Sequence, residues 1–325
     1  MKKLFIMLAA AATVASCAKE STVMEAPGQA IEFGNVFVDN ATRAADPSYS
    51  ANDINAFKVY GIVNNVNILN GDNVTKNGAE YGDAWTLTDA ETTQDLKLYW
   101  IPGAIYKFVG IVDGDKTGVT KTNVDANKMP LTVEYTADGV TDLLCQTIDM
   151  TAKTDGTSNG LVEFNFTHLL SKVNFTVIND SKDAVGNSFV VKNITFNGAT
   201  KATYDVVDKE WETATATGNT VLGNERTVDS STVKDIVVAS GAASAELGTE
   251  VLFIPGEYTI SFTVDILYNG EVITSTDYPA TGTYSHTLVA GNAYNFKVNV
   301  SVGELIQFSV EKQPDWTTNP DVELE

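Results

Sequence analysis

Residues 257–270 read Glu257-Tyr258-Thr259-Ile260-Ser261-Phe262-Thr263-Val264-Asp265-Ile266-Leu267-Tyr268-Asn269-Gly270. The part before Asn269 is rich in the β-branched and aromatic residue types that favour strands. Asn-Gly tolerates the two positive φ angles of a type I′ turn, and a second strand pattern, Glu271–Ser275, follows it directly. This stretch therefore predicts a β-hairpin.

Similar strand patterns recur along most of the chain, at residues 56–63, 94–100, 105–112, 131–135, 161–166, 172–178, 189–196, 201–205, 251–254 and 293–302. Turn and loop signals lie between several of them, at Asn70–Asn73, Pro102-Gly103 and Asn197-Gly198. No window carries an apolar stripe at helical spacing over ten or more residues. Many short strands separated by turn residues are typical of β-sandwiches, so we expect an all-β protein.

The length of 325 residues favours two domains, each large enough for its own core. We place the division near His168–Ser171, between two expected strands. The predicted domains are an N-terminal β-sandwich at residues 44–168 and a C-terminal β-sandwich at residues 169–325.

The first residues have the pattern of an export signal. Lys2 and Lys3 precede a short apolar run that ends in small residues, and the run is too short to span a bilayer stably. Val14-Ala15-Ser16-Cys17 has the form of a bacterial lipobox. We therefore predict a lipoprotein signal peptide at residues 1–16 and lipidation of Cys17.

Residues 17–43 combine a tether with one strand. The segment after Cys17 is polar and punctuated by Pro27-Gly28, and Ile31–Asp39 is rich in β-formers. A small, polar loop then carries Arg43, followed by Ala44. Such loops are where proteases cut. An ordinary connection between two strands is the alternative reading of the same composition.

Charge and cysteine content narrow the function classes. The chain has 21 Lys and Arg against 42 Asp and Glu, a net charge of −21. Nucleic acid and anionic membrane surfaces reward positive charge, so neither is an expected partner. With Cys17 assigned to lipid, Cys145 is the one remaining cysteine, which excludes an intramolecular disulfide. Its setting in Leu143-Leu144-Cys145 favours a small buried apolar side chain over a nucleophile.

Residues that could carry catalysis or bind a metal are few. His168 and His286 are the only histidines, and neither has neighbours at metal-ligand or Ser-His-Asp spacing, so we expect structural roles and no metal. The stretch Asp113–Gly118 resembles a calcium loop but lacks the later acidic ligands, which favours a solvated turn. No phosphate loop or dinucleotide fingerprint is present. We expect no cofactor and no enzymatic activity.

The last strand pattern, Leu305–Lys312, places Ile306, Phe308 and Val310 on one face. A strand of this kind can fill a groove in another molecule. The alternative is an ordinary final strand within its own domain, and the pattern alone does not separate the two.

The chain resembles the fimbrillin (Mfa-like) family, the type V pilins of Bacteroidota. The resemblance rests on features in a fixed order: the lipobox at Cys17, Thr42-Arg43-Ala44, Leu98-Tyr99-Trp100 with the following Pro-Gly, the stretch Val162–Val173, Leu252–Pro255, Leu288–Tyr294 and a terminal strand ending near Trp316. Phe166-x-His168-x-x-Ser171-Lys172-Val173 is the most specific of these. The resemblance implies two transthyretin-like, Ig-like β-sandwich domains in tandem.

The resemblance also implies a function. Precursors of the family are exported as lipoproteins to the outer membrane, and an arginine-specific protease cuts after the first strand, which maps onto Arg43–Ala44. Loss of that strand opens a groove, and the mapped donor is residues 305–312 of a neighbouring subunit. The expected product is an extracellular surface fimbria made of pilin subunits. The competing prediction is a monomeric cell-surface lipoprotein that binds glycans or host ligands and keeps its first strand.

Overall fold

The computed structural model describes residues 28–38, 54–78, 83–113, 119–124, 129–181, 186–302 and 306–313. Every regular element in these ranges is a strand, so the fold is all-β, as the sequence predicts. The strands are β1 Phe33–Val38, β2 Ala56–Val63, β3 Val66–Lys76, β4 Trp85–Thr88, β5 Ile105–Val112, β6 Val119–Val124, β7 Pro130–Thr136, β8 Leu144–Thr151, β9 Val162–His168, β10 Ser171–Asn179, β11 Asn187–Asp205, β12 Glu210–Trp211, β13 Ala216–Leu222, β14 Asn224–Val228, β15 Ser231–Val238, β16 Ser244–Glu246, β17 Val251–Phe253, β18 Gly256–Tyr268, β19 Glu271–Tyr278, β20 Tyr284–Leu288, β21 Ala293–Val300 and β22 Gln307–Gln313.

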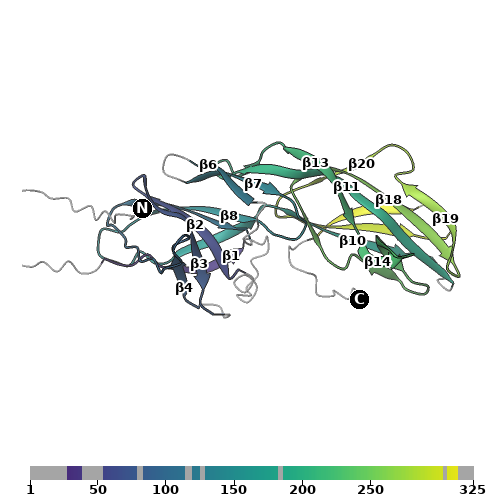
Figure 1. The fold of residues 1–325 in the computed structure, drawn as a ribbon, viewed down its shortest axis with the longest axis horizontal. Helices are drawn as coiled ribbons and strands as arrows, with labels where there is room; N and C mark the ends of the chain where they lie inside the picture. The colour runs from purple at the N-terminus through teal and green to yellow at the C-terminus, as the bar shows by residue number, and fades with distance from the viewer. Residues whose placement is uncertain are drawn as a thin grey trace, which may run out of the picture.

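The molecule is elongated, with the early strands at one end and the late strands at the other (Figure 1). The N-terminal half is built on one sheet in the order β1-β9-β8-β5-β2-β3-β4. Its core is strongly aromatic. The fully or almost fully buried rings there are those of Phe33, Phe57, Trp100, Tyr106, Phe108, Phe164 and Phe166.

Two sheets enclose the core of the C-terminal half. One has the order β16-β10-β21-β22, with β17 also on β10, and the other is centred on β11 and β18. In β18, Tyr258, Ile260 and Phe262 are buried while Thr259 and Ser261 are exposed. This alternation arises because successive strand side chains point to opposite faces.

The predicted hairpin at Asn269-Gly270 is confirmed. Tyr268 pairs with Glu271, and the two turn residues have φ angles of 51° and 87°, both positive as a type I′ turn requires. A second turn of the same kind, which was not predicted, joins β2 to β3. Asn64 and Asn65 occupy it with φ angles of 45° and 65°.

Three local predictions were wrong. Residues 94–100 form only isolated bridges, at Asp95 and Tyr99, because this segment runs along the sheet edge rather than within a ladder. Asn70–Asn73 is not a loop but lies inside β3, next to a bulge. Asn197-Gly198 does not end a strand either, since β11 runs through it to Asp205 and includes the strand expected at 201–205.

The chain passes between the halves at Leu169 and Leu170, between β9 and β10, where a break was predicted. The hairpin of β6 and β7, however, pairs with β11, residues 201–205, and so belongs to a sheet of the C-terminal half. Tyr135 and Val133 of β7 are completely buried in that second core. The division into sandwiches at 44–168 and 169–325 stays a prediction, and β6–β7 is the segment that crosses it.

Candidate functional site

The first strand is an edge strand of the N-terminal sheet. β1 pairs in parallel with β9, with Phe33 opposite Val162 and Val38 opposite Phe166. Just before β1, the backbone N–H of Ile31 donates to the carbonyl of Leu98 over 2.8 Å, and that of Trp100 donates to Gln29 over 2.9 Å. The segment therefore closes the sheet between β9 and residues 98–100.

Apolar side chains hold β1 in place. Ile31, Phe33 and Val36 are 7%, 6% and 1% exposed. The ring of Phe33 lies 6.3 Å from that of Phe57, 6.1 Å from that of Phe108 and 6.5 Å from that of Phe164. Removing β1 would uncover these three rings together with the backbone edge of β9. We call this region the β1 seat: the side chains of Phe57, Phe108 and Phe164 and the facing edge of β9.

The last strand is an edge strand of the sheet that contains β10 and β21. β22 pairs antiparallel with β21, with Val310 opposite Phe296 and Phe308 opposite Val298. Ile306, Phe308 and Val310 are half-buried against the C-terminal core, while Gln307 and Ser309 are exposed. In this structure the strand thus lies in its own half, which is the arrangement that the alternative interpretation of the sequence pattern predicts.

The strand directions show at which end of the molecule β1 and β22 begin. Each half has one end at the junction and one outer end away from it. β9 ends at the junction, and β1 runs parallel to it, so the chain enters β1 at the outer end of the N-terminal half. β10 begins at the junction, β21 is parallel to it, and β22 is antiparallel to β21, so β22 begins at the outer end of the C-terminal half. The two strands begin at opposite ends of the subunit.

The structure does not test three predicted site residues. Cys17, Arg43 and Ala44 all lie outside the described residues, and so does Leu305 at the start of the predicted donor segment. Lipidation and cleavage at these positions stay predictions. The described residues contain no helix with the length and apolar character to cross a membrane.

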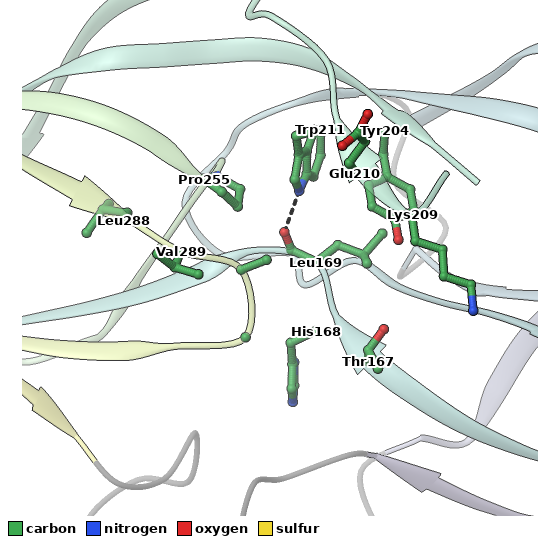
Figure 2. Close-up of a pocket in the computed structure, with 12 residues that line it drawn as sticks. Thr167, His168, Leu169, Tyr204, Lys209, Glu210, Trp211, Pro255, Leu288 and Val289 are labelled. Carbon is green, nitrogen blue, oxygen red and sulfur yellow. Dashed lines mark hydrogen bonds between the residues drawn. The ribbon is translucent and has the colours of Figure 1, made fainter. Parts of the chain in front are cut away.

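A pocket of about 540 Å³ lies at the junction of the halves. Its lining joins Thr167–Leu169 to β11, β12 and the loop after β20 (Figure 2). The indole N–H of Trp211 donates to the carbonyl of Leu169 over 2.7 Å, and the hydroxyl of Ser171 donates to the carbonyl of Val289 over 2.8 Å. These bonds hold the connecting segment against the C-terminal half. The pocket therefore lies where the two halves are joined by a hydrogen-bonded segment.

The two histidines and Cys145 have structural surroundings. His168 Nδ1 lies 2.5 Å from Asp142 Oδ2 and its ring points away from Trp211 (Figure 2). Burial lowers the pKa of His286, whose ring packs on Tyr294 and Phe296. Cys145 is 6% exposed, and burial raises the pKa of its thiol to about 12, which makes it a poor nucleophile.

The described residues hold no group of three or more His, Cys, Asp or Glu side chains that could bind a metal ion. Asp113, from the stretch that resembles a calcium loop, is buried, and its carboxylate accepts from Lys58 Nζ over 3.3 Å. The charge of this carboxylate is therefore balanced by a lysine ammonium. The rest of that stretch, residues 114–118, lies outside the described residues.

The profile of the fimbrillin-like family matches residues 42–314, and the chain belongs to this family. It is therefore a fimbrial subunit of the cell surface that associates with other fimbrial subunits, and not an enzyme. No curated protein matches the chain.

Several solved structures are similar to this chain at low sequence identity, and the first two below, with TM-scores above 0.5, share its fold. A fimbrial protein from Bacteroides vulgatus is 14% identical, with 89% of this chain and 100% of that chain covered and a TM-score of 0.57. A candidate cell adhesion protein from Bacteroides ovatus is 15% identical, with 91% and 100% covered and a TM-score of 0.52. The fimbrial anchor protein Mfa2 from Porphyromonas gingivalis is 12% identical, with 88% and 98% covered and a TM-score of 0.38.

Proposed function

We propose that the chain is a pilin that is exported as a lipoprotein on Cys17, cleaved after Arg43 and polymerised by strand exchange. Cleavage releases residues 1–43, which include β1, and residues 305–312 of a neighbouring subunit then fill the β1 seat. The observation that carries the proposal is that β1 is an edge strand, and that Phe33 and Val36 of β1 and the preceding Ile31 are buried over an aromatic groove. The family match also begins at Thr42, next to the proposed cleavage point.

An empty β1 seat is energetically costly. Each buried Phe, Val or Ile side chain contributes roughly 1.5–3 kcal/mol relative to exposure, and the released segment supplies three of them, Ile31 just before β1 and Phe33 and Val36 within it. The edge of β9 would also lose its hydrogen-bonded partner, and an exposed, apolar strand edge is a template for another strand. A subunit without β1 therefore gains stability by accepting a strand with similar side chains.

The last strand resembles β1 in sequence and in the spacing of its apolar residues. Ile31-Glu32-Phe33-Gly34 corresponds to Ile306-Gln307-Phe308-Ser309. β1 then bulges between Gly34 and Phe37, which gives it one extra residue before Val36. Without that bulge, Val310 falls at the level of Val36. This register places Ile306, Phe308 and Val310 where Ile31, Phe33 and Val36 lie.

The polarity of the exchange is head-to-tail. β22 starts at the outer end of the C-terminal half, so once released it can extend away from its own subunit. Because β1 is entered from the outer end of the N-terminal half, a donor that arrives there runs in the direction of β1, parallel to β9. The contact joins two different surfaces and does not close, so repetition produces a filament.

Release of β22 has its own cost, because Phe308 packs among the rings of Phe262, Tyr278, Tyr284 and Phe296. The same three side chains cannot fill two places at once. The β1 seat is occupied by β1 before cleavage and is open afterwards. Cleavage therefore shifts the balance of β22 toward a neighbouring subunit.

The cleavage step is tested with Arg43→Ala, with Thr42→Ala as the matched control. We expect the Arg43 variant to keep Cys17 as its first residue and to form no fibres, while the control matures to Ala44 and polymerises. Deletion of residues 305–325 should leave maturation intact and stop fibre extension. Ordinary fibres from either the Arg43 variant or the deletion would contradict the proposal.

The register is tested with Ser309→Trp. Ser309 is exposed in its own half, so the subunit should keep its stability. In the β1 seat, the corresponding residue is Gly34, where an added Cβ would lie 2.2 Å from Leu161 Cδ1. Leu161 is 40% exposed, so its side chain can turn away from the small Ser309, whereas the indole of a tryptophan would have to displace it altogether. Gln307→Trp is the control because Glu32, its counterpart, is exposed. Equal fibre formation by both variants would reject this register.

A further inference from the structure

The exposed large hydrophobic side chains gather at the two outer ends of the subunit. The structure describes fourteen such residues that are exposed, from Val66 to Val302. Nine of them lie at these ends. One set is Val66, Tyr99, Ile101, Ile105 and Leu161, and the other is Tyr268, Val272, Ile273 and Val302.

The first set, which we call the entry patch, surrounds the point where the chain enters β1. Tyr99 pairs with Ala30, immediately before β1, and Leu161 lies over Gly34. Ile105 follows the turn that starts at Ile101, and its carbonyl accepts from the backbone N–H of Asn64, beside Val66. Ile101 and Ile105 are 55% and 61% exposed. Strand pairing thus places all five residues at the outer end of the N-terminal half.

The second set, which we call the exit patch, lies at the outer end of the C-terminal half, where β21 ends and from where β22 returns. Tyr268, Val272 and Ile273 flank the tip of the β18–β19 hairpin, and Val302 follows β21. The backbone N–H of Asn269 donates to the carbonyl of Gly186, and that of Val302 donates to the hydroxyl of Ser181. β10, β18 and β21 all end on this side.

If β22 is the donor strand, the short connection before it brings these two patches together. The inference therefore rests on the proposed function. Only residues 303–305 separate Val302 of the exit patch from Ile306. Four residue steps of fully extended chain span at most about 14 Å. With Ile306 in the place of Ile31, the exit patch of the donor must therefore lie against the entry patch of the acceptor.

We infer that the entry patch and the exit patch of successive subunits form a second, apolar interface of the fibre, apart from the exchanged strand. The partner of each patch is the opposite end of another copy of this chain. Apolar surface on one end of a soluble subunit is costly to expose, and its burial at each joint stabilises the polymer. The interface also restricts the angle between neighbouring subunits, which a strand on a short connection alone would not do.

A cysteine pair tests the contact in fibres. The variant with both Ile105→Cys and Ile273→Cys is processed, polymerised and treated with a short bis-maleimide reagent. Cys145 is buried, with a pKa of about 12, so it does not react in the folded subunit. We expect a ladder of covalent multimers from the double variant and none from either single variant, because one end of a subunit meets the other end of the next.

Charged substitutions test the energetic role. Ile105→Glu or Ile273→Glu should lower fibre yield by roughly tenfold or more, because a buried unpaired carboxylate opposes each joint. Val221→Glu is the control, since Val221 is 44% exposed but lies on β13, away from both ends. All three variants should keep the thermal midpoint of the monomer.

The outcomes separate the two proposals. Fibres that form but give no ladder, or ladders from a single-cysteine variant, would overturn the end-to-end interface and leave strand exchange in place. Fibres from the variant lacking residues 305–325 would instead contradict the strand-exchange proposal. Equal yields from Ile105→Glu and Val221→Glu would also overturn the interface.

Discussion

The ring of Phe308 lies 5.0 Å from that of Tyr278, centroid to centroid, and so joins the last strand to the opposite sheet of the C-terminal half. Tyr284 lies equally close, in an edge-on arrangement. The strand proposed to leave the subunit is therefore part of the core of its own half before it leaves. This arrangement makes Phe308 a residue with two roles that can be measured separately.

Phe308→Ala should lower the free energy of unfolding of the precursor by about 2 kcal/mol, because a half-buried ring loses its contacts. The same change should prevent fibre extension, because the donor loses its central side chain. Urea unfolding and electron microscopy measure the two effects. Ser309→Ala, at an exposed neighbour, is the control, and an unchanged unfolding midpoint for Phe308→Ala would contradict the packing.

Phe33→Ala should destabilise the precursor by about 3 kcal/mol, since its ring fills the space between Phe57, Phe108 and Phe164. The cleaved subunit should show no change, because residues 1–43 are absent from it. Urea unfolding of both forms tests this, with the exposed Glu32→Ala as control. A destabilised cleaved form would mean that β1 stays in place after processing.

Gly198→Ala should destabilise the subunit by about 1–3 kcal/mol, because the added Cβ would lie 2.3 Å from Tyr258 Cδ1. Gly218 provides a matched control, since it is the cross-strand partner of Gly198, and a Cβ there would meet only Thr200 at 3.4 Å. Thermal unfolding compares the two. Equal midpoints for the two alanine variants would show that the ring of Tyr258 does not cover Gly198.

His286 should make stability fall as the solution becomes more acidic. Burial lowers its pKa below the ordinary value of 6.5, so the unfolded chain binds the proton more readily than the folded one. The neutral, buried His286 makes its full contribution to the free energy of unfolding above pH 6.5. This contribution is lost as the pH falls from about 6.5 to the lower pKa of the folded state. His286→Phe keeps a ring against Tyr294 and Phe296 and should flatten this part of the pH profile. An identical profile would reject the assignment.

The strands of the chain were predictable because strand and turn signals depend on residues that are adjacent in the sequence. The alternation in Tyr258–Val264 and the Asn269-Gly270 turn each need only neighbouring residues to be recognised, and both are confirmed. The predictions at Asn70–Asn73 and Asn197-Gly198 were wrong for the corresponding reason. Turn-forming residues lie inside β3 and β11, where a bulge and the covering ring of Tyr258 account for them.

The candidate site was only partly predictable. The apolar face of Ile306, Phe308 and Val310 can be recognised in the sequence. The sequence does not tell whether that face packs in its own subunit or in a neighbouring one. The structure adds that Phe308 contacts its own half, that β1 is an edge strand over three aromatic rings, and that the two strands begin at opposite ends. The exposed patches at those ends had no signal in the sequence, because single exposed hydrophobic residues are common on any protein surface.

By itself the sequence determined that the described chain is built from strands, and it indicated an export signal with Cys17 and a candidate cleavage point at Arg43. Strand propensity, turn chemistry and signal motifs all act over a few residues, so they can be recognised without a fold. The tertiary structure alone decided that β6 and β7 join the sheet of the C-terminal half, that β1 and β22 are edge strands, and which side chains remain exposed at the ends. The physical reason is that pairing and burial depend on residues far apart in the chain, and their positions exist only once the sheets have formed.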